Sequence, residues 1–340
     1  MTSALPQLDL RAFTAGTQRQ RADFVEDLRQ AAHGVGFFYL RGYSSSEALP
    51  RALLQAARVF FALPQEQKNA IHMVHSAQLR GYTAAGEEIT RGARDWREQL
   101  DTGAERPLIE QGPGVPPWTR LQGPNQWPAS LPALKPLVLE WQDAMTQTGL
   151  ALLRALALAL GQREDTLLRH FEGQPVQHTK LIRYAAQGRG TTAQGVGPHK
   201  DSGCLTLLLQ DLQGGLQVLD REAAAARWID VPPLEGTLVI NLGEVLEMWS
   251  DGFLRATTHR VVSPQGGKIR YSAAFFLTPR LESELHRLEL PAELAGLARG
   301  VERDPLNPLI AHTGSNLLKG RLRSHRDVAA RHYSALPALA

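Results

Sequence analysis

Apolar residues in the first half of the chain recur at spacings that predict helices. Between residues 50 and 61 they lie three or four positions apart, which places them on one face of a helix. Residues 19–33 predict an earlier helix, and the apolar run 36–40 directly after it predicts a short buried strand. A long helix is predicted over residues 131–160, and Gly161 is suited to end it.

From residue 178 onward the pattern changes to short runs typical of β strands. Gly, Pro and Asp separate these runs, which cover residues 178–184, 205–210, 216–219, 228–231, 237–241, 259–262 and 269–277. Many short strands at close spacing indicate a β sandwich or barrel. Residues 78–103 predict loop and strand, residues 107–128 a proline-rich loop, and residues 291–340 a helical or irregular end. Because no repeat or low-complexity linker interrupts the chain, we expect one domain with a β core and helices packed around it.

Composition narrows the function classes. The 340 residues carry 37 basic and 34 acidic side chains with the two signs interspersed, so nothing indicates a nucleic-acid partner. The single cysteine, Cys204, excludes an intramolecular disulfide and fits a reducing compartment. Residues 1–11 lack a secretory signal pattern, and the most apolar stretch, 150–160, is shorter than the ~20 residues that span a bilayer. We therefore expect a cytoplasmic protein with neither nucleic-acid nor membrane partners.

Residues 195–201 (GVGPHKD) carry the strongest chemical signal. His199 and Asp201 would point to the same side of an extended strand, and Pro198 disfavours helix before them. An imidazole and a carboxylate are two-thirds of a 2-His-1-carboxylate iron site, which leaves positions open for a co-substrate and oxygen. His259, in a strand pattern downstream, is the candidate third ligand. Taken alone, an H-x-D pair often occurs by chance, and His259 could be a packed histidine. Eight other histidines lack such a setting and are interpreted as surface or packing residues: His33, His72, His75, His170, His286, His312, His325 and His332.

A second pair of polar residues lies in the last strand pattern. Arg270 and Ser272 share one strand face, and a guanidinium beside a hydroxyl suits a carboxylate. The apolar residues 273–276 indicate a buried strand, where an arginine needs an anion such as the distal end of 2-oxoglutarate. The alternative is a strand-edge arginine in water. Tyr184 could supply another donor to that carboxylate, or be a core aromatic residue with an exposed hydroxyl.

These residues lie in stretches that resemble one family. The chain resembles the isopenicillin N synthase-like branch of the Fe(II)/2-oxoglutarate-dependent dioxygenases. The resemblance rests on GVGFFYLRGY (34–43), RGY…GEE…EQLD (80–101), GVGPHKDSGCLTLLLQD (195–211), GGLQV (214–218), WIDVP (228–232), NLGEVLEMW (241–249), HRVV (259–262) and RYS (270–272). It covers most of the chain. Lys200 stands where the family more often has threonine, and Glu244 where it often has aspartate, but neither is a ligand position.

The resemblance implies a mainly β fold, a double-stranded β-helix (jelly roll) with surrounding helices. It implies Fe(II) held by His199, Asp201 and His259, and 2-oxoglutarate held by Arg270 and Ser272 with Tyr184 nearby. With O2, such an enzyme hydroxylates, desaturates or cyclises a small organic substrate and releases succinate and CO2. The expected segments are residues 1–115 packed on the core, 116–175 with the long helix, 176–282 as the jelly-roll core and 283–340 as a helical tail.

Other activities share this fold or these residues. An oxidase of the same fold does not use 2-oxoglutarate, and its Arg-x-Ser pair can bind a substrate carboxylate instead. The GEE text is also faintly similar to an ethylene-forming branch of the family. A non-catalytic 2-oxoglutarate- or metal-binding protein and a jelly roll with structural zinc are further alternatives, although zinc prefers a closed site. The side chains expected around the substrate are Arg80, Tyr82, Glu88, Arg97, Lys180 and Phe276.

Overall fold

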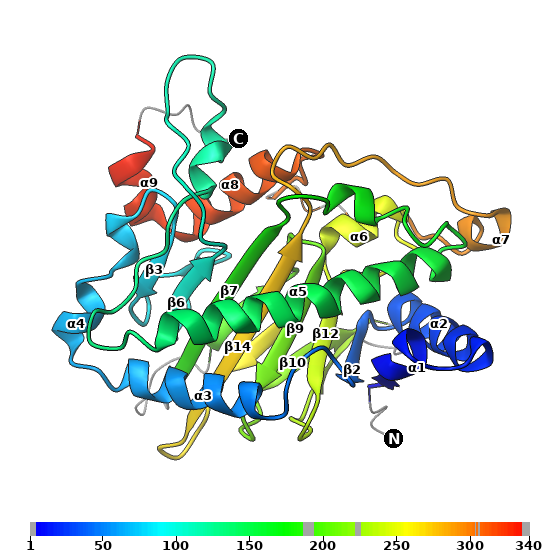
Figure 1. Ribbon diagram of the computed structural model, residues 1–340, viewed down its shortest axis with the longest axis horizontal. Helices are drawn as coiled ribbons and strands as arrows, with labels where there is room; N and C mark the ends of the chain where they lie inside the picture. Colours follow the sequence, from blue (N-terminus) through cyan, green and yellow to red (C-terminus); the bar gives the residue numbers. More distant parts are fainter. Residues whose placement is uncertain (1–4, 186–193, 222–225, 303, 305–306, 335–340) are drawn as a thin grey trace.

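Two β sheets packed face to face form the centre of the molecule (Figure 1). The computed structural model describes residues 5–185, 194–221, 226–302, 304 and 307–334. The large sheet has the order β1 (Gln7–Asp9), β2 (Phe37–Arg41), β12 (Leu238–Leu242), β9 (Leu205–Gln210), β14 (Ile269–Thr278), β7 (Val176–Ala185), β6 (Glu98–Gly103) and β3 (Gly81–Thr83). The small sheet has the order β11 (Arg227–Asp230), β10 (Leu216–Asp220), β13 (His259–Val262) and β8 (Gln194–His199). β4 (Ile89–Thr90) and β5 (Ala93–Arg94) form a separate hairpin.

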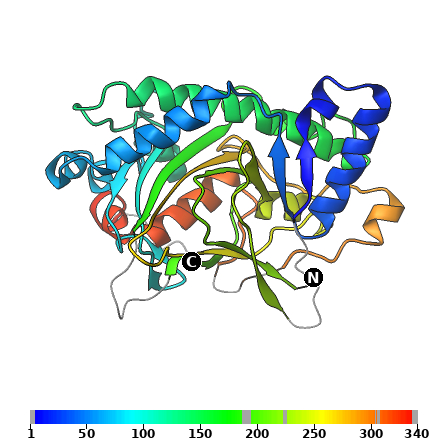
Figure 2. The same cartoon turned by 90° about the horizontal axis from the view of Figure 1, so that it is seen from below.

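The large sheet separates two apolar cores because its side chains alternate between faces. Leu181, Ala273 and Phe275 point to the outer face, where α3 (Ala48–Phe61) and α5 (Leu134–Ala159) cover the strands. Ile182 and Ala274 point to the inner face and pack against the small sheet. Figure 2 shows these helices on one side of the large sheet and the small sheet on the other. This arrangement confirms the predicted jelly roll with surrounding helices.

The remaining helices border this core. They are α1 (Leu10–Thr14), α2 (Gln18–His33), α4 (Gln65–Asn69), α6 (Glu244–Trp249), α7 (Ala292–Ala295), α8 (Thr313–Ser324) and α9 (Arg326–His332). Short 3-10 turns occupy Met73–His75, Pro117–Leu121 and Leu168–His170. Figure 1 shows α8 and α9 beside β3 and β6, at the end of the sheet away from β1. None of the helices in the described part of the chain is long and apolar enough to cross a membrane.

The predicted elements agree with the structure within a few residues. The helix predicted over 131–160 is α5, after which Gly161 adopts a positive φ of 67°. All seven strands predicted after residue 178 are present. β8 is not among the seven apolar runs, because its glycines and proline obscure the alternation of side chains, and Pro198 alone indicated the extended conformation of this segment. The last residues of the predicted tail, 335–340, lie outside the described residues.

Candidate metal and co-substrate site

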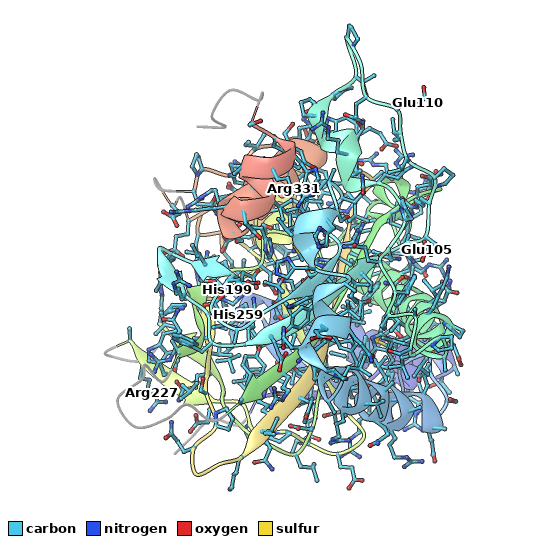
Figure 3. The ribbon with its side chains drawn as sticks, turned by 90° about the vertical axis from the view of Figure 1, so that its left-hand side faces the viewer. Glu105, Glu110, His199, Arg227, His259 and Arg331 are labelled. Carbon is cyan, nitrogen blue, oxygen red and sulfur yellow. The ribbon has the colours of Figure 1, made fainter. Side chains whose placement is uncertain are left out.

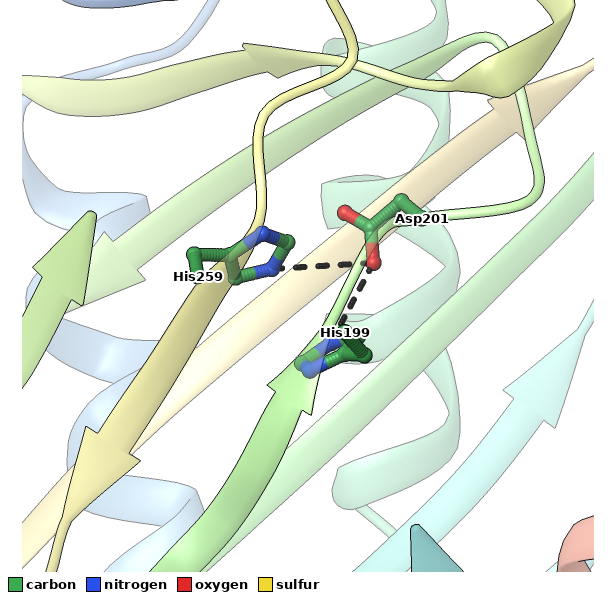
Figure 4. A group of neighbouring side chains, drawn as sticks. All are labelled: His199, Asp201 and His259. Carbon is green, nitrogen blue, oxygen red and sulfur yellow. Dashed lines mark ion pairs between the residues drawn. The ribbon is translucent and has the colours of Figure 1, made fainter. Parts of the chain in front are cut away.

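The pairing of β8 with β13 brings two histidines together. His199 ends β8, His259 begins β13, and the two residues are direct partners in the antiparallel register. Their ring centroids lie 4.3 Å apart. Asp201 follows two residues after His199, and ligand atoms of all three residues lie within 4.8 Å of one another (Figure 4). The structure therefore brings together the three residues that the sequence pattern selected.

The reason given for the shared direction of His199 and Asp201 was partly wrong. We predicted a continuous extended strand through both residues, but β8 ends at His199 and Asp201 lies in the following loop. A carboxylate oxygen, Oδ1, still lies 3.5 Å from His199 Nε2 and 3.8 Å from His259 Nε2. A backbone hydrogen bond between α6 and the loop helps to hold this position, because Glu244 N donates to the Asp201 carbonyl at 2.8 Å.

Hydrogen bonds orient both imidazoles. His199 Nδ1 lies 2.8 Å from the Gly197 carbonyl, and His259 Nδ1 lies 3.1 Å from the Thr257 carbonyl. A carbonyl only accepts, so each Nδ1 carries the proton and each Nε2 keeps a lone pair. Both lone pairs are on the nitrogens nearest Asp201 Oδ1. This is the arrangement in which backbone carbonyls orient histidine ligands toward a metal.

The other carboxylate oxygen of Asp201, Oδ2, accepts hydrogen bonds from two residues of the large sheet. Asn241 Nδ2 donates to Oδ2 at 2.8 Å, and the Thr206 hydroxyl donates to the same oxygen. Both donors come from neighbouring strands, β12 and β9, on the inner face. Asp201 is therefore held by Oδ2, and Oδ1 remains directed at the two histidines.

The electrostatics of Asp201 and His259 favour the protonation states that bind a cation. Burial raises the pKa of Asp201, but His259, His199 and Asn241 outweigh it and hold that pKa well below its usual range. Burial and His199 lower the pKa of His259 to about 4, against the opposing effect of Asp201. Burial lowers the pKa of His199, but the hydrogen bond and charge of Asp201 outweigh it and raise that pKa above its usual value. At neutral pH the carboxylate is ionised and His259 is neutral, as metal binding requires.

The predicted co-substrate pair lies on the same inner face. Arg270 and Ser272 are both completely buried in β14. Arg270 Nη2 donates to Gln210 Oε1 at 2.8 Å, and Nη1 donates to the Ser272 hydroxyl at 3.3 Å. Tyr184 in β7 is buried, and its ring lies 4.8 Å beneath the guanidinium carbon. The structure thus excludes the alternative of a strand-edge arginine in water.

Arg270 has no ion-pair partner among the described residues, and its Nε has no hydrogen-bond acceptor there. A buried guanidinium without an anion is costly, because it has lost water and gained no opposite charge. The two imidazoles and one carboxylate suit an open Fe(II) site rather than a closed zinc site. The residues present therefore fit both a metal and a carboxylate ligand.

Beyond this pair, charged side chains line the inner face toward β6. Glu88 accepts from Arg97 at 2.6 Å and from Lys180 at 2.9 Å. Asp101 Oδ1 lies 2.7 Å from His178 Nε2 and accepts from Arg321 at 2.9 Å. Glu88, Arg97 and Lys180 therefore lie on the side predicted for the substrate. Phe276, also predicted there, packs against His178 at 5.4 Å between ring centroids.

Of the two remaining residues expected around the substrate, Tyr82 lies elsewhere. Tyr82 is on the outer face, where it packs against Phe60 and donates to Glu98 at 2.7 Å. Arg80 donates to the Leu121 carbonyl at 3.1 Å. The prediction failed for Tyr82 because a shift of one residue in a strand moves a side chain to the other face.

Arg321 of α8 and His325, which follows that helix, also contribute to the site, and the sequence pattern did not predict them. Arg321 reaches Asp101, and the buried His325 ring lies 3.5 Å from Glu88. Figure 3 shows His199 and His259 on the side of the molecule that carries these helices, below the one labelled at Arg331. No local signal in the sequence distinguished His325 from the other packing histidines.

Comparison with known proteins identifies the family. Residues 174–279 match the 2OG-Fe(II) oxygenase superfamily, and residues 5–130 match the domain described as non-haem dioxygenase in morphine synthesis N-terminal. The chain belongs to the 2OG-Fe(II) oxygenase superfamily. Similar proteins include a 2-oxoglutarate-dependent dioxygenase of Dothideomycetidae sp. (34% identical over 96% of this chain and 90% of the relative). Homoarginine-6-hydroxylase 2-ODD-C23 of Glycine max is 32% identical over 78% of this chain and 81% of that protein.

Solved structures agree with the assignment to this superfamily. A putative 2OG-Fe(II) oxygenase family protein from Caulobacter crescentus has a TM-score of 0.74 at 29% identity, covering 95% of this chain and 99% of that one. A full-length Neurospora crassa protein in complex with alpha-KG has a TM-score of 0.73 at 25% identity, covering 93% and 95%. This superfamily protein is an Fe(II)- and 2-oxoglutarate-dependent oxygenase. The alternatives of an oxidase independent of 2-oxoglutarate and of a non-catalytic binding protein are not favoured.

Proposed function

We propose that His199, Asp201 and His259 hold the Fe(II), and that Arg270 and Ser272 bind the distal carboxylate of 2-oxoglutarate. The observation that carries this proposal is the completely buried Arg270, which lacks an acidic partner in the described part of the chain. Its free Nε, and the N–H groups of Nη1 and Nη2 that are not used by Ser272 and Gln210, offer donors to a carboxylate. Arg270 and Ser272 lie on the face of the large sheet that packs against the small sheet, which carries His199 and His259. Both ends of one short dicarboxylate therefore find partners between the two sheets.

Each residue has a distinct task in this proposal. The iron and 2-oxoglutarate supply the oxidising chemistry when bound. Asn241 and Thr206 keep Asp201 oriented through Oδ2, so that Oδ1 is free for the metal. Tyr184, whose ring packs against the Arg270 guanidinium, would help hold that guanidinium in place for the co-substrate carboxylate. The buried inner wall keeps water away from the reacting atoms, which protects the oxidant from wasteful side reactions.

The substrate proposed for this centre is a small organic molecule. We further propose four functional segments, with residues 176–282 as the jelly-roll core and residues 1–115, 116–175 and 283–340 packed around it. The contacts of Arg321 with Asp101 and of His325 with Glu88 support a role for the last segment at the substrate side of the site. A cytoplasmic location is proposed from the single buried cysteine, which is a free thiol.

The proposal is tested with protein loaded with iron under anaerobic conditions. We expect binding of 2-oxoglutarate and slow formation of succinate after O2 is admitted, even without the primary substrate. Binding of 2-oxoglutarate and formation of succinate should both be measured beside the His199→Ala variant, which lacks one proposed metal ligand and should form no succinate. Wild-type protein that fails to bind 2-oxoglutarate would refute the proposal. Succinate formation that persists in His199→Ala would refute the assignment of the ligands.

A further inference from the structure

The inner face of β6 carries three polar residues in succession. Arg97, directly before the strand, Gln99 and Asp101 alternate with outward-facing residues, and we call these three the β6 wall. Gln99 is paired with Ile182 of β7, which lies in the apolar core between the two sheets. The next residue, Leu100, belongs to the core beneath the helices. The β6 wall therefore faces the interior that contains the metal ligands.

Each member of the β6 wall has buried polar atoms without a hydrogen-bond partner among the described residues. In Gln99, which is completely buried, both the amide oxygen and the amide nitrogen lack a partner. The same holds for Arg97 Nε and Asp101 Oδ2. Buried polar groups are normally satisfied by protein, water or ligand, and leaving them unpaired is costly. Four such atoms on one strand face therefore indicate a surface built to meet a polar molecule.

The charged members of this region already form ion pairs within the protein. Glu88 is paired with Arg97 and Lys180, and Asp101 is paired with Arg321 through Oδ1. The neutral amide of Gln99 is thus the group in the β6 wall that lacks the most hydrogen-bond partners among the described residues. A charged ligand would have to compete with existing ion pairs, whereas a neutral polar ligand would not.

The β6 wall also lies close to the metal ligands. Asp95 Oδ1 accepts from the Gly197 backbone in β8, two residues before His199, at 3.1 Å. Arg97 Nη2 lies 3.8 Å from the other oxygen of Asp95. The wall therefore begins beside the strand that ends at His199, and β7 lies between it and Arg270.

We propose that the β6 wall recognises the primary substrate and that Gln99 pairs with an amide edge of it. This inference rests on the proposed function and names its substrate class: a small neutral molecule with a carboxamide, lactam or cyclic imide. A primary carboxamide presents one acceptor and one donor side by side, and an amide edge presents the complementary pair. A carboxylate offers only acceptors and would leave the Gln99 oxygen unmatched. A hydrocarbon would leave both atoms unsatisfied.

The first test compares the stability of two nearly isosteric variants, Gln99→Leu and Gln142→Leu. Gln142 in α5 is equally buried, but its Nε2 donates to Thr102 Oγ1 at 3.2 Å. We expect Gln142→Leu to lower the melting temperature, because it removes an internal hydrogen bond. We expect Gln99→Leu to melt at or above the wild-type temperature in the absence of ligands, because it removes two unsatisfied atoms. A fall in melting temperature for Gln99→Leu as large as that for Gln142→Leu would overturn the inference.

The second test measures binding with two matched probes, δ-valerolactam and cyclohexanone, to anaerobic protein loaded with Fe(II) and 2-oxoglutarate. The lactam has a complete amide edge, whereas the ketone of the same ring size only accepts. Calorimetry should show saturable lactam binding at least about tenfold tighter than ketone binding, since a site that hydrogen-bonds its ligand rejects the analogue without the donor. Gln99→Leu should abolish that difference, and Gln142→Leu should keep it.

The outcomes separate this inference from the proposed function. Wild-type protein that binds 2-oxoglutarate and forms succinate, but binds lactam no better than ketone or not at all, overturns the substrate class and leaves the iron and co-substrate assignments intact. Wild-type protein that does not bind 2-oxoglutarate overturns the proposed function, and the inference falls with it.

Discussion

Replacing Arg270 by methionine should separate co-substrate binding from folding. Methionine keeps much of the side-chain length and removes the charge. If the guanidinium pairs with the distal carboxylate of 2-oxoglutarate, the substitution leaves a buried carboxylate without its cation. Breaking such a pair costs about 3–5 kcal/mol. At about 1.4 kcal/mol per tenfold change, the Kd for 2-oxoglutarate should weaken by roughly two to four orders of magnitude.

The same substitution should hardly affect the stability of ligand-free protein. Arg270 is completely buried without an acidic partner in the described structure, so methionine removes a desolvation penalty. It also breaks the bond to Gln210 Oε1, which costs about 1–3 kcal/mol. Because these terms oppose each other, we expect the free energy of unfolding to stay within about 1 kcal/mol of wild type.

Calorimetric titration of 2-oxoglutarate into anaerobic metal-loaded protein, together with urea unfolding, measures both quantities. Arg183→Met is the matched control, because Arg183 lies on the outer face of the neighbouring strand and pairs with Glu98 inside the protein. The control should lose stability and keep its affinity for 2-oxoglutarate. A folded Arg270→Met protein whose Kd is weakened less than about tenfold would refute the reasoning.

Three further changes test neighbouring features. Asn241→Leu removes one of two donors to Asp201 Oδ2, so metal affinity in a chelator competition should fall roughly 10–100-fold; an unchanged affinity would contradict this role. Burial, above all, lowers the pKa of His178 to about 3, so the folded state stays neutral while the unfolded chain gains a proton below about pH 6.5. The free energy of unfolding of the wild type should therefore fall as the pH drops from 7 to 5. In urea unfolding, His178→Gln should lose up to about 2 kcal/mol less of that free energy than the wild type over the same pH range; equal pH dependence in the two proteins would contradict the role of His178. Gly243→Ala would place a Cβ 2.2 Å from the Gly203 carbonyl oxygen, so it should cost about 1–3 kcal/mol of stability, and unfolding at the wild-type midpoint would disprove the clash.

The strands and the ligand triad were predictable because their signals are local. Alternating or continuous apolar runs mark β7, β9 and β14. The alternation of successive side chains between the two faces follows from strand geometry alone. His199 and Asp201 are two residues apart, so a short loop keeps them together whether or not the strand continues. His259 needed the antiparallel register of β8 and β13, which the resemblance to a family supplied and the sequence pattern did not.

The substrate wall was less predictable because it depends on register between distant strands. Tyr82 and Thr83 are adjacent, yet only one of them shares the inner face with Gln99. The sequence around β3 lacks a clear alternation that would decide between them. The contact of Arg321 with Asp101 joins segments 220 residues apart, so only the tertiary fold defines it. Polar residues in strands are expected to be exposed until the structure shows that both faces are covered.

Arg270 and Gln99 indicate bound ligands for the same physical reason. Arg270 and Gln99 are both completely buried on the inner face, and each has polar atoms that no described residue satisfies. Packing cannot account for them, because leucine or methionine would fill the same volume without the desolvation penalty. The ligand-free protein is therefore less stable than it would be with apolar side chains of the same volume at these two positions. Ligand binding offsets this loss of stability by supplying the missing hydrogen-bond and ion-pair partners. A carboxylate suits the charged group and an amide suits the neutral one. The chemistry of each unsatisfied side chain thus indicates a different ligand, on opposite sides of β7 and on one face of the large sheet.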